Sequence, residues 1–257
     1  MRMLLWLAVC SILSAVPYEA AVGQDVAAVL APSGRLRIAV YAGSPTSLVK
    51  DASTGDARGV TVDIGIELAR RLGVPYDLVL HQRPAEVLQS LSSAKADFAI
   101  TNATAERAKI VDFGPPVLSL ELGFLVPQRQ GVDVASLEAP DVAIGVLKGS
   151  TSERSLPMRL ARARIVATAS LDEASEKLLR GEIAAFATNK SVLFEMSDKT
   201  PGTRVLETRW GVEHLAIAVP KGRDAARTFI EAFSLDVMGP LVNAAASRAG
   251  LRGRATD

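Results

Sequence analysis

The chain is poor in the residues that cross-link a fold or bind soft metals. Its 257 residues include one cysteine, Cys10, and two histidines, His81 and His214. Cys10 lies in an N-terminal apolar run, so a mature protein without that run has no disulfide, cysteine–metal site or thiol nucleophile. Neither histidine has a second histidine or a carboxylate at metal-ligand spacing. We therefore expect no metal and no cofactor, and a fold stabilised by its core alone.

Aromatic residues and an excess of one charge are also scarce. Aromatic residues make up 5% of the chain, and 29 Lys+Arg stand against 28 Asp+Glu. Since no basic stripe is present either, nucleic acid is not an expected partner. Hydrophobic residues at 49% and charged residues at 22% are the balance of a globular protein with a core. No segment after the first residues is long and apolar enough for a membrane span.

The N-terminus differs from the rest of the chain. "MRMLLWLAVCSILSAV" joins a basic residue to an apolar run that is too short for a membrane span, and small residues follow. We predict a signal peptide over residues 1–23, cleaved between Ala20 and Gly23, and an exported mature protein. The alternatives are an uncleaved anchor and, less favoured because Val9 precedes Cys10, a lipoprotein.

Short apolar runs alternate with helical patterns over the first half of the chain. Strands are predicted at 36–41, 76–80 and 96–100, and helices at 62–73 and 84–93. Strands separated by helices need crossover connections. The pattern therefore favours an α/β fold with a largely parallel sheet.

The same order restarts after an extended segment at 117–130. The pattern predicts strands at 141–147, 163–168 and 183–188, a helix at 170–181, a return segment at 214–222, and helices within 224–250. We interpret this as two α/β lobes joined by two crossings. Lobe 1 is expected at 35–125 plus 215–257, and lobe 2 at 127–210.

The stretch "TNATAERAKIVDF" (101–113) follows a predicted strand. Open α/β sheets expose ligand sites at the carboxyl ends of their strands, which is where Thr101, Asn102 and Thr104 stand. Thr104 can also cap the short helix that carries Arg107. A guanidinium can hold a carboxylate through two parallel hydrogen bonds, so Arg107 is a candidate carboxylate ligand.

Spacing alone leaves a second interpretation of Arg107 equally open. Glu106 and Asp112 lie close enough in the sequence to pair with it on the surface. In that case the arginine would be an ordinary solvated residue and would bind nothing.

Three stretches carry a resemblance to a known family: "GVTVDIGIELARRLGV", "KADFAITNATAERAKIVDFG" and "VAIGVLKGSTSE". Between residues 35 and 250 the chain resembles the periplasmic solute-binding proteins of the amino-acid type, family 3, and "ERAKIVDF" is the most specific piece. The resemblance implies a type II periplasmic binding protein fold and a periplasmic location. It also implies an ABC permease of the inner membrane as partner, and we expect a monomer.

The resemblance also implies residue roles. The arginine of the family motif binds the ligand's carboxylate and maps onto Arg107, and the polar groups upstream map onto Thr101 and Asn102, with Thr104. The family's "KGT" loop maps onto "KGST", so Ser150 and Thr151 are expected contacts from lobe 2. There a helix N-terminus offers free amides to an anion.

Two departures from the family pattern bear on the ligand. An acid that holds an amino acid's ammonium usually ends the strand matched by "IAAFAT", and here Asn189 follows that strand. Asn189 cannot neutralise a cation, and an unpaired buried ammonium is costly. The first loop, "YAGSPTSLV", lacks the usual stacking aromatic and leaves only Tyr41 nearby. We therefore expect a polar pocket for a small carboxylate, with an organic acid favoured over an amino acid.

The leading hypothesis is a non-enzymatic binding subunit of an ABC importer. It would close on a small carboxylate through hinges near 123–129 and 209–216. One alternative is a periplasmic dehydratase acting on prephenate or arogenate, with Glu153 or Glu182 as the nearest candidate acid. Another is an accessory protein to a periplasmic redox enzyme.

Overall fold

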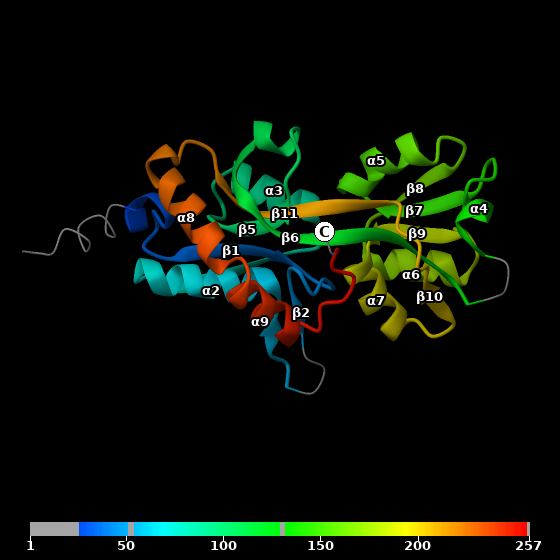
Figure 1. Ribbon diagram of the computed structural model, residues 1–257, viewed down its shortest axis with the longest axis horizontal. Helices are drawn as coiled ribbons and strands as arrows, with labels where there is room; N and C mark the ends of the chain where they lie inside the picture. The colour runs from blue at the N-terminus through cyan, green and yellow to red at the C-terminus, as the bar shows by residue number, and fades with distance from the viewer. Residues whose placement is uncertain (1–25, 51–53, 129–131, 256–257) are drawn as a thin grey trace, which may run out of the picture.

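The computed structural model describes residues 26–50, 54–128 and 132–255. The predicted signal peptide (1–23), which includes Cys10, lies outside the described residues. Figure 1 shows two bodies side by side along the long axis, joined by the long strands β6 (Val111–Pro127) and β11 (Gly211–Pro220).

The first body is built on parallel strands. β1 (Leu36–Tyr41) pairs in parallel with β4 (Tyr76–His81), and a parallel bridge from Ile38 to Phe98 connects β1 to the residues that precede β5 (Ala99–Asn102). The short strands β2 (Val49–Lys50) and β3 (Ala57–Arg58) pair with each other. Helices α2 (Val60–Leu72), α3 (Pro84–Ser92), η2 (Asp224–Ala226), α8 (Arg227–Val237) and α9 (Pro240–Arg248) surround these strands.

Local sequence explains where these helices begin and end. Pro84 opens α3, where its missing N–H costs nothing. Gly73 ends α2 with φ 67°, a left-handed conformation that glycine adopts without strain. Both helices were predicted within two residues of these bounds.

The second body repeats the parallel arrangement. β7 (Ala143–Leu147) lies between β8 (Arg164–Thr168) and β9 (Ala185–Asn189) and is parallel to both. Helices α4 (Val134–Leu137), α5 (Thr151–Arg159), α6 (Leu171–Leu179) and α7 (Lys190–Lys199) and strand β10 (Thr203–Val205) complete it. Ser150, Ser170 and Asn189 each cap the following helix by accepting a hydrogen bond from a backbone N–H three residues on.

The crossings supply the antiparallel pairs of the main sheet. β11 runs antiparallel to β6 and to β5, and β6 also pairs antiparallel with β9 and β10. One sheet of order β5-β11-β6-β9-β7-β8 therefore runs through both bodies. β6 begins at Val111 rather than at 117, because Val111 through Phe113 pair with the end of β11.

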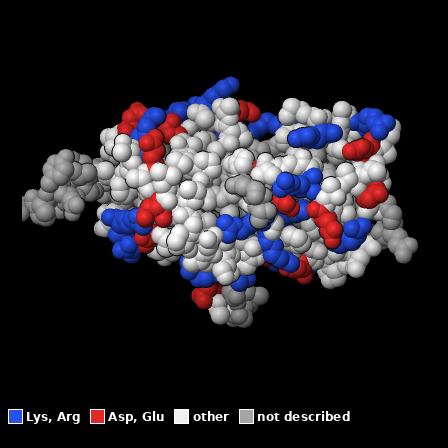
Figure 2. All heavy atoms as spheres, viewed as in Figure 1, with Lys and Arg blue, Asp and Glu red and all other residues white. Residues whose placement is uncertain are grey.

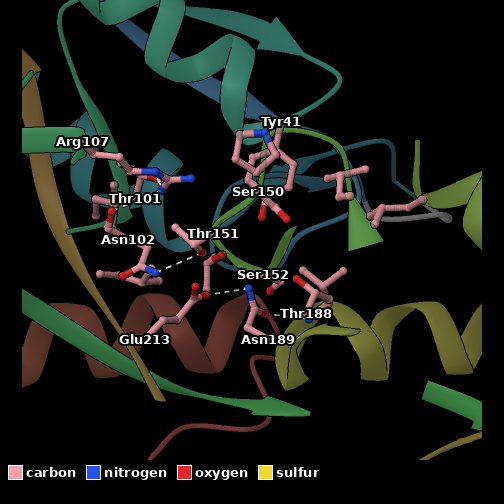
Figure 3. Close-up of a pocket in the computed structure, with 17 residues that line it drawn as sticks. Tyr41, Thr101, Asn102, Arg107, Ser150, Thr151, Ser152, Thr188, Asn189 and Glu213 are labelled. Carbon is pink, nitrogen blue, oxygen red and sulfur yellow. Dashed lines mark hydrogen bonds between the residues drawn. The ribbon is translucent and has the colours of Figure 1, made fainter. Parts of the chain in front are cut away.

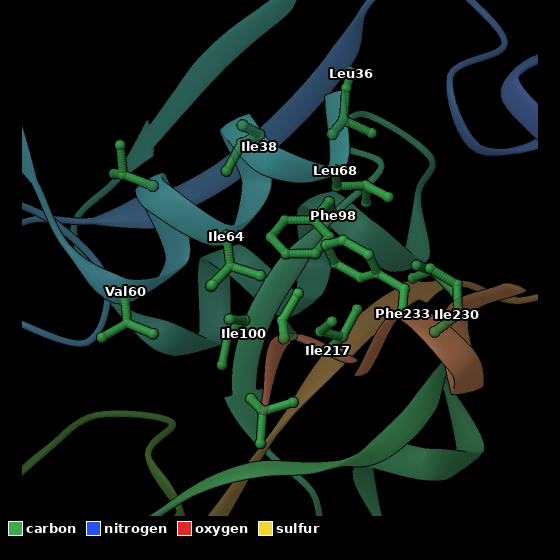
Figure 4. Packing of buried hydrophobic residues seen from close by; sticks show 14 of the residues in the cluster. Leu36, Ile38, Val60, Ile64, Leu68, Phe98, Ile100, Ile217, Ile230 and Phe233 are labelled. Carbon is green, nitrogen blue, oxygen red and sulfur yellow. The ribbon is translucent and has the colours of Figure 1, made fainter. Parts of the chain in front are cut away.

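The buried side chains form separate clusters in the two bodies. The largest includes Phe98, Ile217 and Phe233 (Figure 4) and draws only on residues 26–120 and 215–246. Two further clusters draw only on residues 124–206. We propose that these groups mark the predicted lobes, 35–125 plus 215–257 and 127–210, and we call the two bodies lobe 1 and lobe 2.

Charges on the surface are mixed. Figure 2 shows Lys and Arg interspersed with Asp and Glu over both lobes on the face in view. Within the described part of the chain no single helix is both long and apolar enough for a membrane span. One bent pair, Asp224–Val237 with Pro240–Arg248 at 66°, passes that test jointly. Ile230, Phe233 and Val242 of this pair belong to the lobe 1 core.

Candidate functional site

A cavity of about 40 Å³ lies between the lobes and is lined by both. Figure 3 shows its polar side chains converging from lobe 1, lobe 2 and β11. Its residues are Tyr41, Thr46, Pro84, Ile100, Thr101, Asn102 and Arg107 of lobe 1; Leu147, Ser150, Thr151, Ser152, Leu171, Thr188, Asn189 and Val192 of lobe 2; and Glu213 and Leu215 of β11. Seven of the eight predicted ligand contacts are among them.

Arg107 is the buried cation of this cavity. Its side chain follows β5 on the short helix η1 (Arg107–Lys109), and the residue is 3% exposed. Nη1 donates to Thr101 Oγ1 at 2.9 Å and to the Asn102 carbonyl at 3.2 Å, while buried Nε has no hydrogen-bond partner among the described residues. Burial lowers the pKa of Arg107 to about 10, so the guanidinium stays charged at neutral pH.

The surface alternative for Arg107 does not hold. Glu106 pairs with Arg154 of α5 at 3.0 Å, and Asp112 pairs with Lys221 at 2.8 Å. With both neighbouring carboxylates engaged elsewhere, the guanidinium lies in the cavity, although its contact with a ligand stays a prediction.

The three polar residues upstream of Arg107 separate into two roles. Thr101 and Asn102 line the cavity, and Asn102 Nδ2 donates to Thr151 Oγ1 of lobe 2 at 3.2 Å. Thr104 does not line the cavity but lines an adjoining groove, and its contact with a ligand stays a prediction. The Thr104 hydroxyl accepts from the backbone N–H of Arg107 at 3.2 Å and so caps the turn, as predicted.

The loop before α5 brings lobe 2 against lobe 1. Ser150 caps α5, so the helix N-terminus opens beside Arg107 and the cavity favours an anion there. Gly149 has φ 75°, and a Cβ added to it would lie 2.5 Å from Cβ of Ala85 in lobe 1. Only a residue without a side chain permits this approach.

Glu213 is the functional candidate that the sequence did not reveal. It stands on β11, is 8% exposed, and accepts a hydrogen bond from Asn189 Nδ2 at 2.9 Å. Burial raises the pKa of its carboxyl group, against the opposing effects of Arg107 and of hydrogen bonds from Asn189 and Thr151. Figure 3 shows Glu213 and Arg107 reaching toward Thr151 from different sides. Within the described chain no ion pair joins the two charges.

Asn189 lines the cavity and is hydrogen-bonded within the protein on both sides of its amide, while its predicted contact with a ligand stays a prediction. Its Oδ1 accepts from the Val192 N–H at 3.1 Å and caps α7, while its amide nitrogen donates to Glu213. The expectation that the pocket lacks a negative charge is therefore wrong: β11 brings a carboxylate to the amide that replaces the usual acid.

Tyr41 lies in the cavity wall as predicted. Burial raises the pKa of its phenol to about 12, so the ring stays neutral. Thr46, Ser152 and Thr188 also line the cavity and were not predicted. These hydroxyls had no signal in the sequence, because small polar residues occur throughout it.

The two acids considered for enzymatic work do not reach the cavity. Glu153 accepts from the Gly149 N–H at 2.5 Å, and Glu182 pairs with Lys177 and Arg180 on the surface. Among residues 26–50, 54–128 and 132–255 no group of three or more His, Cys, Asp or Glu is arranged to hold a metal ion.

Comparison with known proteins decides the family. The family model described as "Bacterial extracellular solute-binding proteins, family 3" matches residues 36–238. The chain belongs to this family. Its members are extracellular or periplasmic, bind small ligands and work with ABC permeases, which confirms the resemblance inferred from the sequence.

Individual relatives agree with the family. This solute-binding protein is 26% identical over 196 residues to the ABC transporter glutamine-binding protein GlnH of Bacillus subtilis (strain 168), covering 72% of this chain and 69% of the relative. It is similar to the solved solute receptor for L-cysteine of Neisseria gonorrhoeae, with a TM-score of 0.75, 26% identity, and 87% and 92% of the two chains covered.

A third comparison concerns the fold alone. The ancestral amino acid-binding protein AncCDT-1, described as a precursor of cyclohexadienyl dehydratase, aligns with a TM-score of 0.73 and 23% identity, covering 86% of this chain and 98% of its own. These likenesses confirm the predicted two-lobed type II fold.

Proposed function

We propose that this solute-binding protein captures a small α-amino acid between its lobes and delivers it to an ABC permease. The observation that carries the proposal is that a buried guanidinium, Arg107, and a buried carboxyl group, Glu213, line one cavity without an ion pair between them. An α-amino acid has the matching pair of charges on neighbouring atoms. The proposal replaces the organic acid favoured from sequence.

A zwitterionic ligand matches both Arg107 and Glu213. A charge-assisted hydrogen bond from Arg107 to a carboxylate is worth about 1.5–3 kcal/mol. A buried carboxylate is costly unless a cation or hydrogen bonds compensate it, and an ammonium beside Glu213 supplies that compensation. A simple organic acid would satisfy Arg107 but add a second negative charge near Glu213. The zwitterion is therefore favoured over the anion.

Ligand binding is coupled to closure of the two lobes. Arg107 belongs to lobe 1, Thr151 to lobe 2, and Glu213 to a crossing strand, so a ligand contacts all three only when the lobes are together. β6 and β11 are the strands about which the lobes would rotate. The Asn102–Thr151 hydrogen bond and the Glu106–Arg154 ion pair span the cleft in this closed arrangement.

Calorimetry with matched ligands tests the proposal. Alanine, serine, cysteine and glutamine would be titrated beside acetate, lactate and succinate. We expect at least one amino acid to bind and the organic acids to bind weakly or not at all. Tight binding of a simple carboxylate, with no amino acid bound, would contradict the role given to Glu213.

One observation favours a second candidate, a dehydratase of the prephenate or arogenate type. Glu213 is a buried carboxyl group with a raised pKa in the cleft, the property expected of a general acid. The cavity of about 40 Å³ speaks against a ring-bearing substrate. Incubation with prephenate, monitored for phenylpyruvate, should give no product; formation of product that is lost in Glu213→Gln would establish the enzyme instead.

A further inference from the structure

The cavity is small and lies between two larger hollows. On a scale where one water takes about 10–15 Å³, its volume of about 40 Å³ is that of about three waters. A groove of about 750 Å³ shares Asn102, Thr151 and Glu213 with it. A groove of about 330 Å³ shares only Leu171. The two grooves have no residue in common, so they approach the cavity from different sides.

The larger groove adjoins the charged part of the cavity. Arg107 donates to the carbonyl of Asn102, which lines both spaces, and Glu213 itself lines both, so the two proposed ligand anchors lie on the side of the cavity that adjoins that groove. The hydrogen bond from Asn102 to Thr151 closes this side. A ligand held by its two charges therefore extends its side chain elsewhere.

The smaller groove adjoins the cavity at an apolar contact. Leu171, the first residue of α6 in lobe 2, lines both spaces. A Cβ added to Gly43 of lobe 1 would lie 2.9 Å from Leu171 Cδ1, so the leucine side chain packs directly on that loop. Leu171 therefore lies between the cavity and the groove and packs against a loop of lobe 1.

We propose that Leu171 determines specificity by limiting the ligand to an α-amino acid with a short side chain. The proposal rests on the proposed function and refines it. The cavity has space for only about three waters, and Leu171 lies between it and a groove that contains neither charged anchor. A side chain of the length of glutamine or arginine would have to displace Leu171.

The charged residues of the smaller groove, on the far side of Leu171, predict which ligands a Leu171→Ala variant would bind. Asp172, Glu176 and Glu195 line the groove against one cation, Lys199, which pairs with Glu195 at 2.7 Å. Leu171→Ala removes most of the wall and joins the cavity to this acidic groove. Long cationic amino acids should therefore gain more than long neutral ones.

Isothermal titration with glycine, alanine, serine, cysteine, glutamine and arginine tests the proposal. We expect the wild type to bind a short amino acid and Leu171→Ala to bind arginine at least about tenfold more tightly than the wild type does, equivalent to about 1.4 kcal/mol. Adding Glu176→Gln to that variant should reverse part of the gain. Leu179→Ala is the matched control, since Leu179 lines the same groove, is 62% exposed and does not line the cavity.

Each outcome decides one claim. Wild-type binding of arginine or glutamine as tight as that of alanine or serine would overturn the size limit and leave the amino-acid function standing. The size limit would also be overturned if Leu171→Ala still bound the short amino acid but bound long amino acids no more tightly than the wild type does. If the wild type binds no amino acid, the proposed function fails and this proposal fails with it.

Discussion

Arg107 and Glu213 are opposite charges in one cavity, and they reach it by different routes. Arg107 sits at a strand end within a local motif, six residues from the Thr101 hydroxyl that accepts its hydrogen bond. Glu213 sits on the returning strand β11, and its partner Asn189 is 24 residues away. The comparison teaches that a site assembled within one segment can be identified from sequence, whereas a site assembled across a crossing needs the register of the strands.

Removing the cation should have the largest effect. Arg107→Ala should weaken amino-acid binding by about 10- to 100-fold, the equivalent of a lost charge-assisted hydrogen bond. The measurement is calorimetry on the wild type and variant, with exposed Arg227→Ala as the matched control. Unchanged affinity in Arg107→Ala would place the site elsewhere.

Replacing Glu213 should weaken amino-acid binding less than replacing Arg107 does. It should also raise the stability of the ligand-free protein. Glu213→Gln keeps a hydrogen-bond acceptor for Asn189 but loses the carboxylate that we propose binds the ligand's ammonium. Because burial raises the pKa of Glu213, its ionisation destabilises the folded ligand-free protein at neutral pH. The variant should therefore melt at a higher temperature without ligand and respond less to alanine in a thermal-shift assay. A lower melting temperature combined with normal alanine binding would contradict both expectations.

The same pKa shift predicts how stability and binding depend on pH. The folded pKa lies above the ordinary value near 4.5, so the folded protein binds more protons than the unfolded one between the two values. The contribution of Glu213 to ligand-free stability is therefore complete below pH 4.5 and is lost as the pH rises through the folded pKa.

Ligand affinity should follow the opposite course. It should fall as the pH drops through the raised pKa of Glu213, at a higher pH than for an ordinary glutamate, while Arg107, with a pKa of about 10, stays charged. Titrations that start at alkaline pH and extend down to pH 4.5, the ordinary value for a glutamate, on the wild type and Glu213→Gln separate the two groups. A pH profile that is identical in the two proteins would assign the titration to another residue.

The smallest effect is expected at the ion pair across the cleft. Glu106 and Arg154 are 61% and 43% exposed, and exposed pairs are worth about 0.2–1 kcal/mol. Glu106→Gln should weaken binding no more than about fivefold, and added salt should remove the difference. A loss as large as that in Arg107→Ala would mean that Glu106 acts on Arg107 directly.

Much of the fold follows from the sequence because its signals are local. Gly73 and Pro84 fix helix ends, and the apolar runs at 36–41 and 141–147 coincide with β1 and β7 within two residues. The predicted placement of Arg107, Ser150 and Thr151 beside one cavity also follows from this order of strands.

The position of Glu213 could not be predicted, because it depends on pairing between strands that are far apart in the sequence. Glu213 lies in "GVEHLAIAV", where alternation predicts a strand but not which face meets the cavity. The antiparallel pairing of β11 with both β5 and β6 fixes that face. Thr104 lies outside the cavity lining, and its hydroxyl accepts a hydrogen bond from the backbone N–H of Arg107, a local role that the sequence also predicted.

The close approach of Gly149 to Ala85 has a consequence for transport. A methyl group at position 149 would act as a wedge that keeps the lobes ajar even with the amino acid in place. Such a protein would still bind the ligand through its lobe 1 contacts but would not present the closed form to the permease. Transport would therefore be lost while ligand binding remained.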